Sequence, residues 1–168
     1  MRSQSLQFSK CAIAMPSDDF FQFEADFVDS LRCIPMQVRM KLDTCGVKLK
    51  LPQWHQFSQE ERQQLTQQPC TTHEEAQTYR DYLQSLVKHY TGEPAKELAI
   101  DPSPSWLAED TIPDSVQIKA EEVGYPMSLE QWHQLRPIQR FALIKLSQSG
   151  HENRNFLPAI QEFGLVPG

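Results

Sequence analysis

Apolar residues recur along most of this chain at the spacing of a helix rather than with the alternation of a strand. The clearest case lies between residues 72 and 92, where apolar positions repeat every three or four residues: Ala76, Tyr79, Leu83, Leu86 and Tyr90. This spacing places them on one face of a helix. Thr72 opens the stretch as the first residue of a Thr-His-Glu-Glu capping box, and Gly92 supplies a left-handed cap at its end. The pattern predicts one long helix between them.

The same order of apolar and turn residues occurs twice in the chain. Residues 34–65 align without gaps to residues 112–143 at an offset of 78, and 12 of the 32 positions are identical. The identical residues include Pro35 and Pro113, Gly46 and Gly124, Trp54-His55-Gln56 and Trp132-His133-Gln134, and Arg62 and Arg140. This level of self-similarity predicts a duplication of a multi-helix unit.

Proline, glycine and helix-capping residues divide each copy into several helices. The shared proline suits the first turn of a helix, and the shared glycine eleven residues later suits its end. A short helix that contains the tryptophan follows. A capping box begins at Ser128, at the start of this short helix in the second copy, and another begins at Ser58, at the start of the next helix in the first copy. In the second copy Phe156, Ile160 and Phe163 share a helical face that Gly164 ends, with Pro158 expected in its first turn.

The predicted fold is all-α, with two diverged tandem copies of the unit packed as one globular domain spanning residues 20–168. Repeat 1 covers about 34–90 and repeat 2 about 112–165, joined by an acidic, proline-rich connector at about 91–111 that we expect to be an extended loop. Residues 1–19 lack helical periodicity, so we predict a disordered N-terminal tail. For residues 20–31, where alternation and helical spacing both fit, we expect an extended lead-in followed by a short helix from about Ala25.

The charge pattern excludes several function classes. The whole chain carries a net charge of −6, and the stretch 91–122 alone accounts for it, with eight acidic residues against Lys96 and Lys119. No basic stripe occurs, so nucleic acid is not an expected partner. The acidic stretch fits either a solvated linker or a docking site for a basic partner. No apolar run reaches the ~18 residues of a membrane span, and residues 1–15 lack a secretory apolar stretch, so we expect a cytoplasmic protein.

The four cysteines, Cys11, Cys33, Cys45 and Cys70, match no zinc or CxxC spacing. We therefore expect no metal site and interpret them as structural thiols. A redox role stays open, and Cys70 is the best candidate for a reactive cysteine, because it precedes the predicted helix at residue 72 and a helix N-terminus lowers the pKa of a thiol.

The repeated Trp-His-Gln segment has two interpretations. A pair of histidines related by the repeat fits a metal or shared ligand, but no carboxylate or thiol lies beside them in sequence. We favour the structural interpretation, in which the tryptophan packs while histidine and glutamine cap a neighbouring helix. No nucleophile, P-loop or dinucleotide motif appears either, so we predict no catalytic residues and a protein that is not an enzyme.

Features that the two copies do not share are better candidates for function. One is the acidic stretch. The other is the run from Gly150 to Asn155, rich in hydrogen-bond donors, at a predicted helix N-terminus where anions bind favourably. His151, Asn153 and Arg154 are the candidate ligand-binding residues, with Arg154 suited to a phosphate. Ordinary helix capping is the alternative interpretation of this run.

Several long motifs resemble one known family. They are Phe20–Phe27, Leu31–Pro35, Lys41–Gly46, Phe57–Arg62, Pro69–Thr71, Gln139–Leu146 and His151–Pro158. Together they are similar to the nitrate reductase-associated protein family of cyanobacteria. The resemblance implies a non-enzymatic accessory or maturation factor that binds molybdenum-cofactor nitrate reductase in nitrate assimilation, without a cofactor of its own. The alternative it leaves is a small-ligand or redox module that carries or senses the molybdopterin cofactor. The family offers no catalytic residues to carry over.

Overall fold

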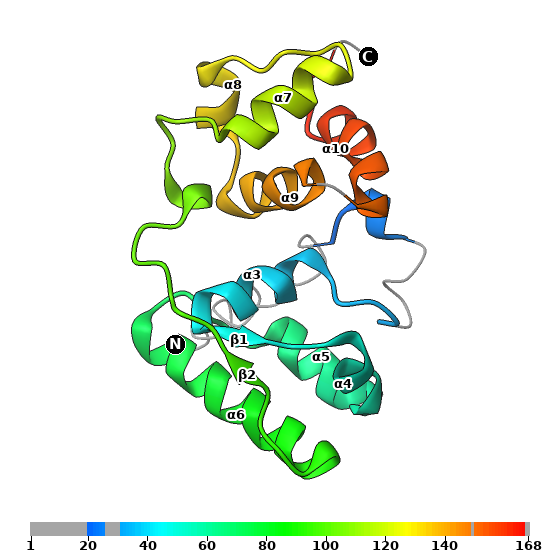
Figure 1. Cartoon of the computed structure of the whole chain (residues 1–168), viewed down its shortest axis with the longest axis vertical. Coiled ribbons are helices and arrows are strands. Elements are labelled where there is room, and N and C mark those ends of the chain that lie inside the picture. Colours follow the sequence, from blue (N-terminus) through cyan, green and yellow to red (C-terminus); the bar gives the residue numbers. More distant parts are fainter. Residues whose placement is uncertain (1–19, 26–30, 149, 167–168) are drawn as a thin grey trace, which may run out of the picture.

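The computed structural model describes residues 20–25, 31–148 and 150–166, and in these the chain is mostly helical, as predicted. The helices form two lobes (Figure 1). The first lobe contains α3 (Met36–Cys45), α4 (Leu51–Gln56), α5 (Gln59–Gln67) and α6 (His73–Thr91). The second contains α7 (Asp114–Glu122), α8 (Leu129–Gln134), α9 (Pro137–Ser147), the 3-10 helix η5 (His151–Asn155) and α10 (Phe156–Glu162). The predicted disordered tail, residues 1–19, lies outside the described residues.

The predicted capping boxes define where three of these helices begin. At the start of α6 the Glu75 backbone N–H donates to Thr72 Oγ1 at 3.1 Å, and the Glu75 carboxylate accepts from the Thr72 N–H at 3.0 Å. Ser58 and Ser128 make the same reciprocal pairs at the starts of α5 and α8. Gly92, with a φ of 88°, ends α6 in the left-handed conformation. These local signals act within a few residues, which explains why the sequence alone predicts them.

The fold departs from a purely α architecture in the connector. Residues Lys96–Glu97 form a strand, β2, that pairs antiparallel with β1 (Val47–Lys48), and residues Ser105–Leu107 form a 3-10 helix, η4. The expectation of an extended loop therefore holds for most of the connector, but η4 is not extended and β2 is paired with β1. The cause lies at Gly46, where a φ of 75° turns the chain at the end of α3 and its carbonyl accepts a hydrogen bond from the Leu98 N–H at 2.8 Å.

The lead-in to the first lobe is also not extended. Residues Gln22–Glu24 form a 3-10 helix, η3, while most of the short helix expected from Ala25, residues 26–30, lies outside the described part of the chain. The Glu24 carboxylate accepts from the backbone N–H of Phe21 at 3.3 Å and of Met36 at 2.7 Å. This carboxylate holds the turn and attaches it to the start of α3.

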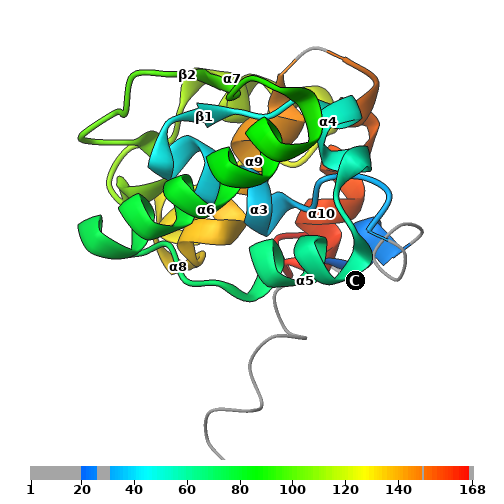
Figure 2. The same cartoon turned by 90° about the horizontal axis from the view of Figure 1, so that it is seen from below.

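Two clusters of buried side chains stabilise the two lobes. Trp54, Tyr79 and Leu83 belong to the first cluster, and Trp132, Phe141 and Phe156 belong to the second. The helix α3 contacts both α6 and α9, and Figure 2 shows it behind α6 when the molecule is seen from below. The lobes therefore meet along α3.

The repeated tryptophans build the fold, as the structural interpretation predicted. Both are fully buried, and their indole N–H groups donate to backbone carbonyls, Trp54 to Leu31 at 2.7 Å and Trp132 to Ala108 at 2.8 Å. The histidines do not cap helices. His55 contacts the Arg32 carbonyl at 2.8 Å, whereas His133 faces the Glu109 carboxylate at 3.5 Å. Within the described residues no cluster of potential metal ligands forms, and no helix is both long and apolar enough to cross a membrane.

Candidate functional site

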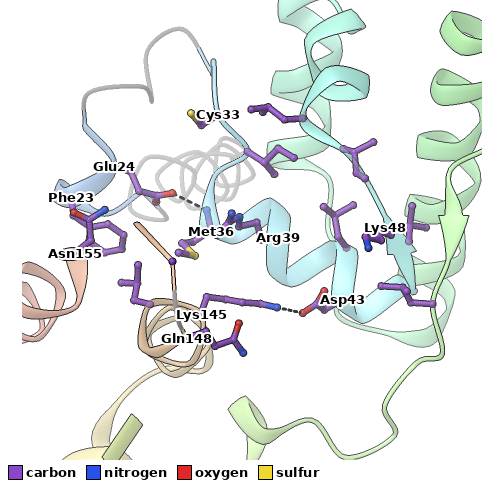
Figure 3. Close-up of a pocket in the computed structure, with 18 residues that line it drawn as sticks. Phe23, Glu24, Cys33, Met36, Arg39, Asp43, Lys48, Lys145, Gln148 and Asn155 are labelled. Atoms are coloured by element: carbon purple, nitrogen blue, oxygen red, sulfur yellow. Dashed lines mark hydrogen bonds and ion pairs between the residues drawn. The ribbon is translucent and has the colours of Figure 1, made fainter. Parts of the chain in front are cut away.

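A cleft of about 670 Å³ lies where the two lobes meet (Figure 3). One wall comes from α3 and from the chain that follows it into β1 and α4, and the other from α9, from Gly150 and from Asn155, the last residue of η5. Much of the lining is apolar: Phe23, Ile34, Met36, Leu42, Val47, Leu49, Leu51, Leu98 and Leu146. This size is typical of pockets that hold a small molecule or a short segment of another protein.

Charged side chains give the cleft an electrostatic character that differs from the rest of the molecule. Arg39, Lys48 and Lys145 line it together with Glu24 and Asp43, so cations outnumber carboxylates there although the whole chain has a net charge of −6. An acidic group is therefore better matched to this cleft than to the rest of the surface.

One ion pair crosses the cleft from lobe to lobe. The Lys145 ammonium on α9 lies 2.9 Å from the Asp43 carboxylate on α3, and both side chains are about one third exposed (Figure 3). The same ammonium lies 5.2 Å from the centre of the Phe141 ring. Lys145 is thus positioned by the second lobe's core. Lys48, in contrast, is exposed on β1, where a bound group can reach it.

Glu24 has a structural role at one end of the cleft. Its side chain is 2% exposed, and its two oxygens accept the backbone hydrogen bonds from Phe21 and Met36. Burial raises the pKa of Glu24, while these hydrogen bonds and the nearby Arg39 guanidinium act in the opposite direction. This carboxyl is therefore occupied with holding η3 against α3 and is not offered to a ligand.

The run Gly150–Asn155, predicted as an anion site, reaches the cleft only in part. Gly150 and Asn155 line it, whereas the predicted ligand-binding residues Asn153 and Arg154 are not among the lining residues, and Arg154 is exposed. His151 begins the 3-10 helix η5, and the α-helix α10 starts at residue 156. The predicted helix N-terminus therefore lies later in the chain than we expected, and a phosphate site at His151, Asn153 and Arg154 stays a prediction.

The cleft cations were not singled out by the sequence patterns. Their equivalents at the offset of 78 are Gln117 for Arg39, Pro126 for Lys48 and Gln67 for Lys145. All three therefore occupy positions where the copies differ. Because most aligned positions differ in this way, the difference does not single these cations out, and only the packing of α3 against α9 shows that they converge.

The acidic stretch uses several of its carboxylates in internal contacts. Glu97 forms an ion pair with Arg80 of α6, and Glu109 lies 3.5 Å from the buried Arg140. The stretch runs along the outside of both lobes from β2 to α7 (Figure 1). Trp106 attaches it to the second lobe by packing edge-on against Phe141, with ring centres 5.1 Å apart.

Two cysteines come together in the core of the first lobe. Cys45 and Cys70 are both buried, free thiols, and they lie near each other, since their sulfurs contact the carbonyls of the consecutive residues Leu42 and Lys41, each at 3.7 Å. Cys33 is an exposed thiol that lines the cleft.

The comparison with protein families decides where the chain belongs. Residues 20–163 match the family described as conserved nitrate reductase-associated protein. The chain belongs to this family. The match covers both lobes and the cleft between them, and it confirms the family that the sequence motifs resemble. No curated protein and no solved structure matches the chain significantly.

Proposed function

We propose that this protein is a non-catalytic accessory factor that binds nitrate reductase and assists its maturation. Membership in the nitrate reductase-associated family supports the link to that enzyme. The cleft between the lobes supports binding as the mode of action, because its walls are largely apolar and its charged residues are mainly cations.

A segment of the reductase that carries acidic and apolar side chains fits this cleft best. Leu42, Val47 and Leu98 offer apolar contacts, and the exposed Lys48 offers a partner for a carboxylate. Complementary charge fixes the register of such a segment and accelerates its association. Leu51 and Leu98 are each 42% exposed at the cleft, so apolar surface is available for a partner to bury.

A second candidate function is suggested by the same cations. Arg39, Lys48 and Lys145 surround a volume within the usual range for small-molecule sites. In this alternative the ligand is the molybdopterin cofactor, held through its phosphate, and the protein carries it to the enzyme. Basic side chains and the amide of Asn155 supply the donors that a phosphate needs.

The deciding experiment measures binding of the purified protein to purified nitrate reductase, with and without its cofactor. Lys48→Glu reverses an exposed charge in the cleft, and Lys88→Glu on the outer face of α6 is the matched control. We expect Lys48→Glu to weaken binding to the reductase and Lys88→Glu to leave it unchanged. If wild type retains the reductase in neither form, or if both variants bind equally well, the proposal is wrong.

A parallel titration separates the two candidates. Isolated cofactor is added to the wild type, to Lys48→Glu and to Arg154→Ala in the absence of the reductase. Cofactor binding that Lys48→Glu abolishes supports the carrier function, and loss in Arg154→Ala alone supports the predicted site in η5 instead. Absence of binding to all three removes the carrier function.

We also infer that the two lobes descend from one duplicated unit and function as a single cytoplasmic domain. The arginine hydrogen bonds support the duplication, because Arg62 Nε and Arg140 Nε each donate to the carbonyl of the repeated tryptophan at 3.2 Å. The ion pair between Asp43 and Lys145 supports a single domain. One cooperative unfolding transition, and recovery of the protein in the cytoplasmic fraction of its cells, are the results expected.

A further inference from the structure

Cys45 and Cys70 meet where α3 ends and the chain turns toward α6. Cys45 is the last residue of α3, and Cys70 lies two residues before Thr72, the N-cap of α6. The Cys70 thiol contacts the Lys41 carbonyl and the Cys45 thiol contacts the Leu42 carbonyl, each at 3.7 Å. Because these carbonyls belong to consecutive residues of α3, the two sulfurs lie near each other beside this helix.

The surroundings give the two thiols different chemistry. The neighbouring Cys45 thiol lowers the pKa of Cys70, and the Lys41 ammonium lowers it further, while burial and Glu75 oppose the change. The neighbouring Cys70, together with burial, raises the pKa of Cys45. Lys41 is held in place because its ammonium donates to the carbonyls of Thr66 at 2.6 Å and Gln68 at 2.7 Å. Cys70 is therefore the more acidic thiol of the pair.

Two residues of α6 complete the environment of the pair. The fully buried Tyr79 is close enough to interact with both thiols, and its own pKa is raised well above the ordinary value, first by burial. The Arg80 guanidinium also acts on Cys45 and favours its ionised form. Cys70 is 7% exposed and Cys45 is 1% exposed. An incoming molecule therefore reaches Cys70 first.

We infer that Cys45 and Cys70 form a redox-active dithiol that reacts with low-molecular-weight disulfides and closes to an intramolecular disulfide. This inference does not depend on binding to nitrate reductase. It assigns a modification site and gives each cysteine a role, with Cys70 as the attacking thiol and Cys45 as the resolving thiol.

The reaction balances in two exchange steps. The Cys70 thiolate attacks one sulfur of the small disulfide, forms a mixed disulfide and releases one small thiolate. Cys45 then loses its proton to solvent and attacks the Cys70 sulfur, which releases the second small thiolate. The two cysteines are oxidised by two electrons, and the small disulfide is reduced to two thiols.

The comparison of the two copies argues that the pair is not needed to build the helical unit. At the offset of 78 the residue equivalent to Cys45 is Val123, and the residue equivalent to Cys70 is Gln148. The second lobe therefore forms the same order of helices without either sulfur. Leu42 and Val47, which flank Cys45 in sequence, line the cleft, so a disulfide at Cys45 fixes a wall of that cleft.

The test uses the full chain with Cys11→Ser and Cys33→Ser, which leaves Cys45 and Cys70 as the remaining thiols. The reduced, folded protein is incubated with oxidised glutathione at neutral pH, quenched with an alkylating reagent and analysed by mass spectrometry. We expect a product lighter by two hydrogens that dithiothreitol converts back. Failure of the folded protein to form this product overturns the inference, and so does formation only after urea has unfolded it.

Single variants in the same background test the assigned roles. With Cys45→Ser, Cys70 should accumulate as a mixed disulfide with glutathione, because the thiol that resolves this intermediate is missing. With Cys70→Ser, reaction at Cys45 should be on the order of tenfold slower, because a buried, protonated thiol is a poor nucleophile. Circular dichroism checks that each variant is folded. Faster reaction at Cys45 than at Cys70 contradicts the assignment.

Discussion

The Lys145 ammonium lies 2.9 Å from the Asp43 carboxylate, and this ion pair joins α9 of one lobe to α3 of the other. A partly exposed pair contributes roughly 0.2–1 kcal/mol to stability. Lys145→Ala should therefore lower the free energy of unfolding only slightly, whereas Lys145→Glu should lower it more because two carboxylates then face each other. Urea denaturation at low salt measures both effects.

The charge-swapped double variant Asp43→Lys/Lys145→Glu is the control for this prediction. It restores opposite charges at the same positions, so it should regain stability relative to Lys145→Glu. A double variant no more stable than Lys145→Glu shows that the loss comes from packing around Phe141 rather than from charge.

Gly46→Ala and Gly124→Ala form a matched pair that separates backbone strain from a steric clash. Both glycines have positive φ, 75° and 89°. A Cβ on Gly46 meets the Leu98 carbonyl oxygen at 2.7 Å, whereas a Cβ on Gly124 meets nothing within 4 Å. Gly124→Ala should cost about 1–2 kcal/mol, the penalty of the left-handed conformation.

Gly46→Ala should cost clearly more, because the chain at Leu98, directly after β2, must also move away from Gly46. Thermal unfolding followed by circular dichroism compares the two variants directly. Equal losses contradict the close approach of Leu98 to Gly46.

Arg140→Lys should destabilise the protein strongly. The Arg140 side chain is 2% exposed and donates to three carbonyls, those of Trp132 at 3.2 Å, Trp106 at 2.8 Å and Leu135 at 2.6 Å. A lysine ammonium cannot donate to all three carbonyls in this geometry, so at least one buried carbonyl is left without a partner. We expect the free energy of unfolding to fall by on the order of 3 kcal/mol.

Arg62→Lys is the matched control in the first lobe. Arg62 is partly exposed, and its contact with the Leu31 carbonyl is long, at 3.5 Å. Water can hydrogen-bond to the carbonyls that Arg62→Lys leaves without a partner, so the change in the urea midpoint should be smaller than for Arg140→Lys. An effect of Arg62→Lys as large as that of Arg140→Lys argues against burial as the cause.

Glu24→Gln should change how stability depends on pH. Because burial raises the pKa of Glu24 above 4.5, the folded chain keeps this proton at pH values where the unfolded chain has lost it. Its contribution to stability is therefore fully present below the unfolded pKa and is lost as pH rises through the folded pKa. Between those values, the stability of wild type relative to Glu24→Gln should fall as pH rises. A rise instead shows that the hydrogen bonds from Phe21 and Met36 outweigh burial.

The helices with their own start and stop residues were predictable from the sequence. Thr72 and Gly92 bound α6 through hydrogen bonds that reach only three or four residues, so a single sequence contains the whole signal. The strands could not be predicted in this way. Val47 pairs with Glu97 across a large sequence separation, and each strand is two residues long, too short for an alternating pattern.

The cleft was beyond prediction for a related reason. Asp43 and Lys145 are unremarkable charged residues within helical patterns, and they face each other only because α3 packs against α9. The run at His151–Asn155 was recognised by its polarity, and Asn155 does reach the cleft. Its boundary was misplaced because η5 precedes α10 there.

The helix α3 has one face in each of the two clusters of buried side chains. Met36 and Met40 pack with the second cluster, and Val38, Leu42 and Cys45 pack with the first. A chain cut within the connector would therefore give a C-terminal fragment whose core lacks the methionines that close it. The two fragments should recover native structure only when they are mixed, because α3 of the N-terminal fragment then completes the core of the C-terminal fragment.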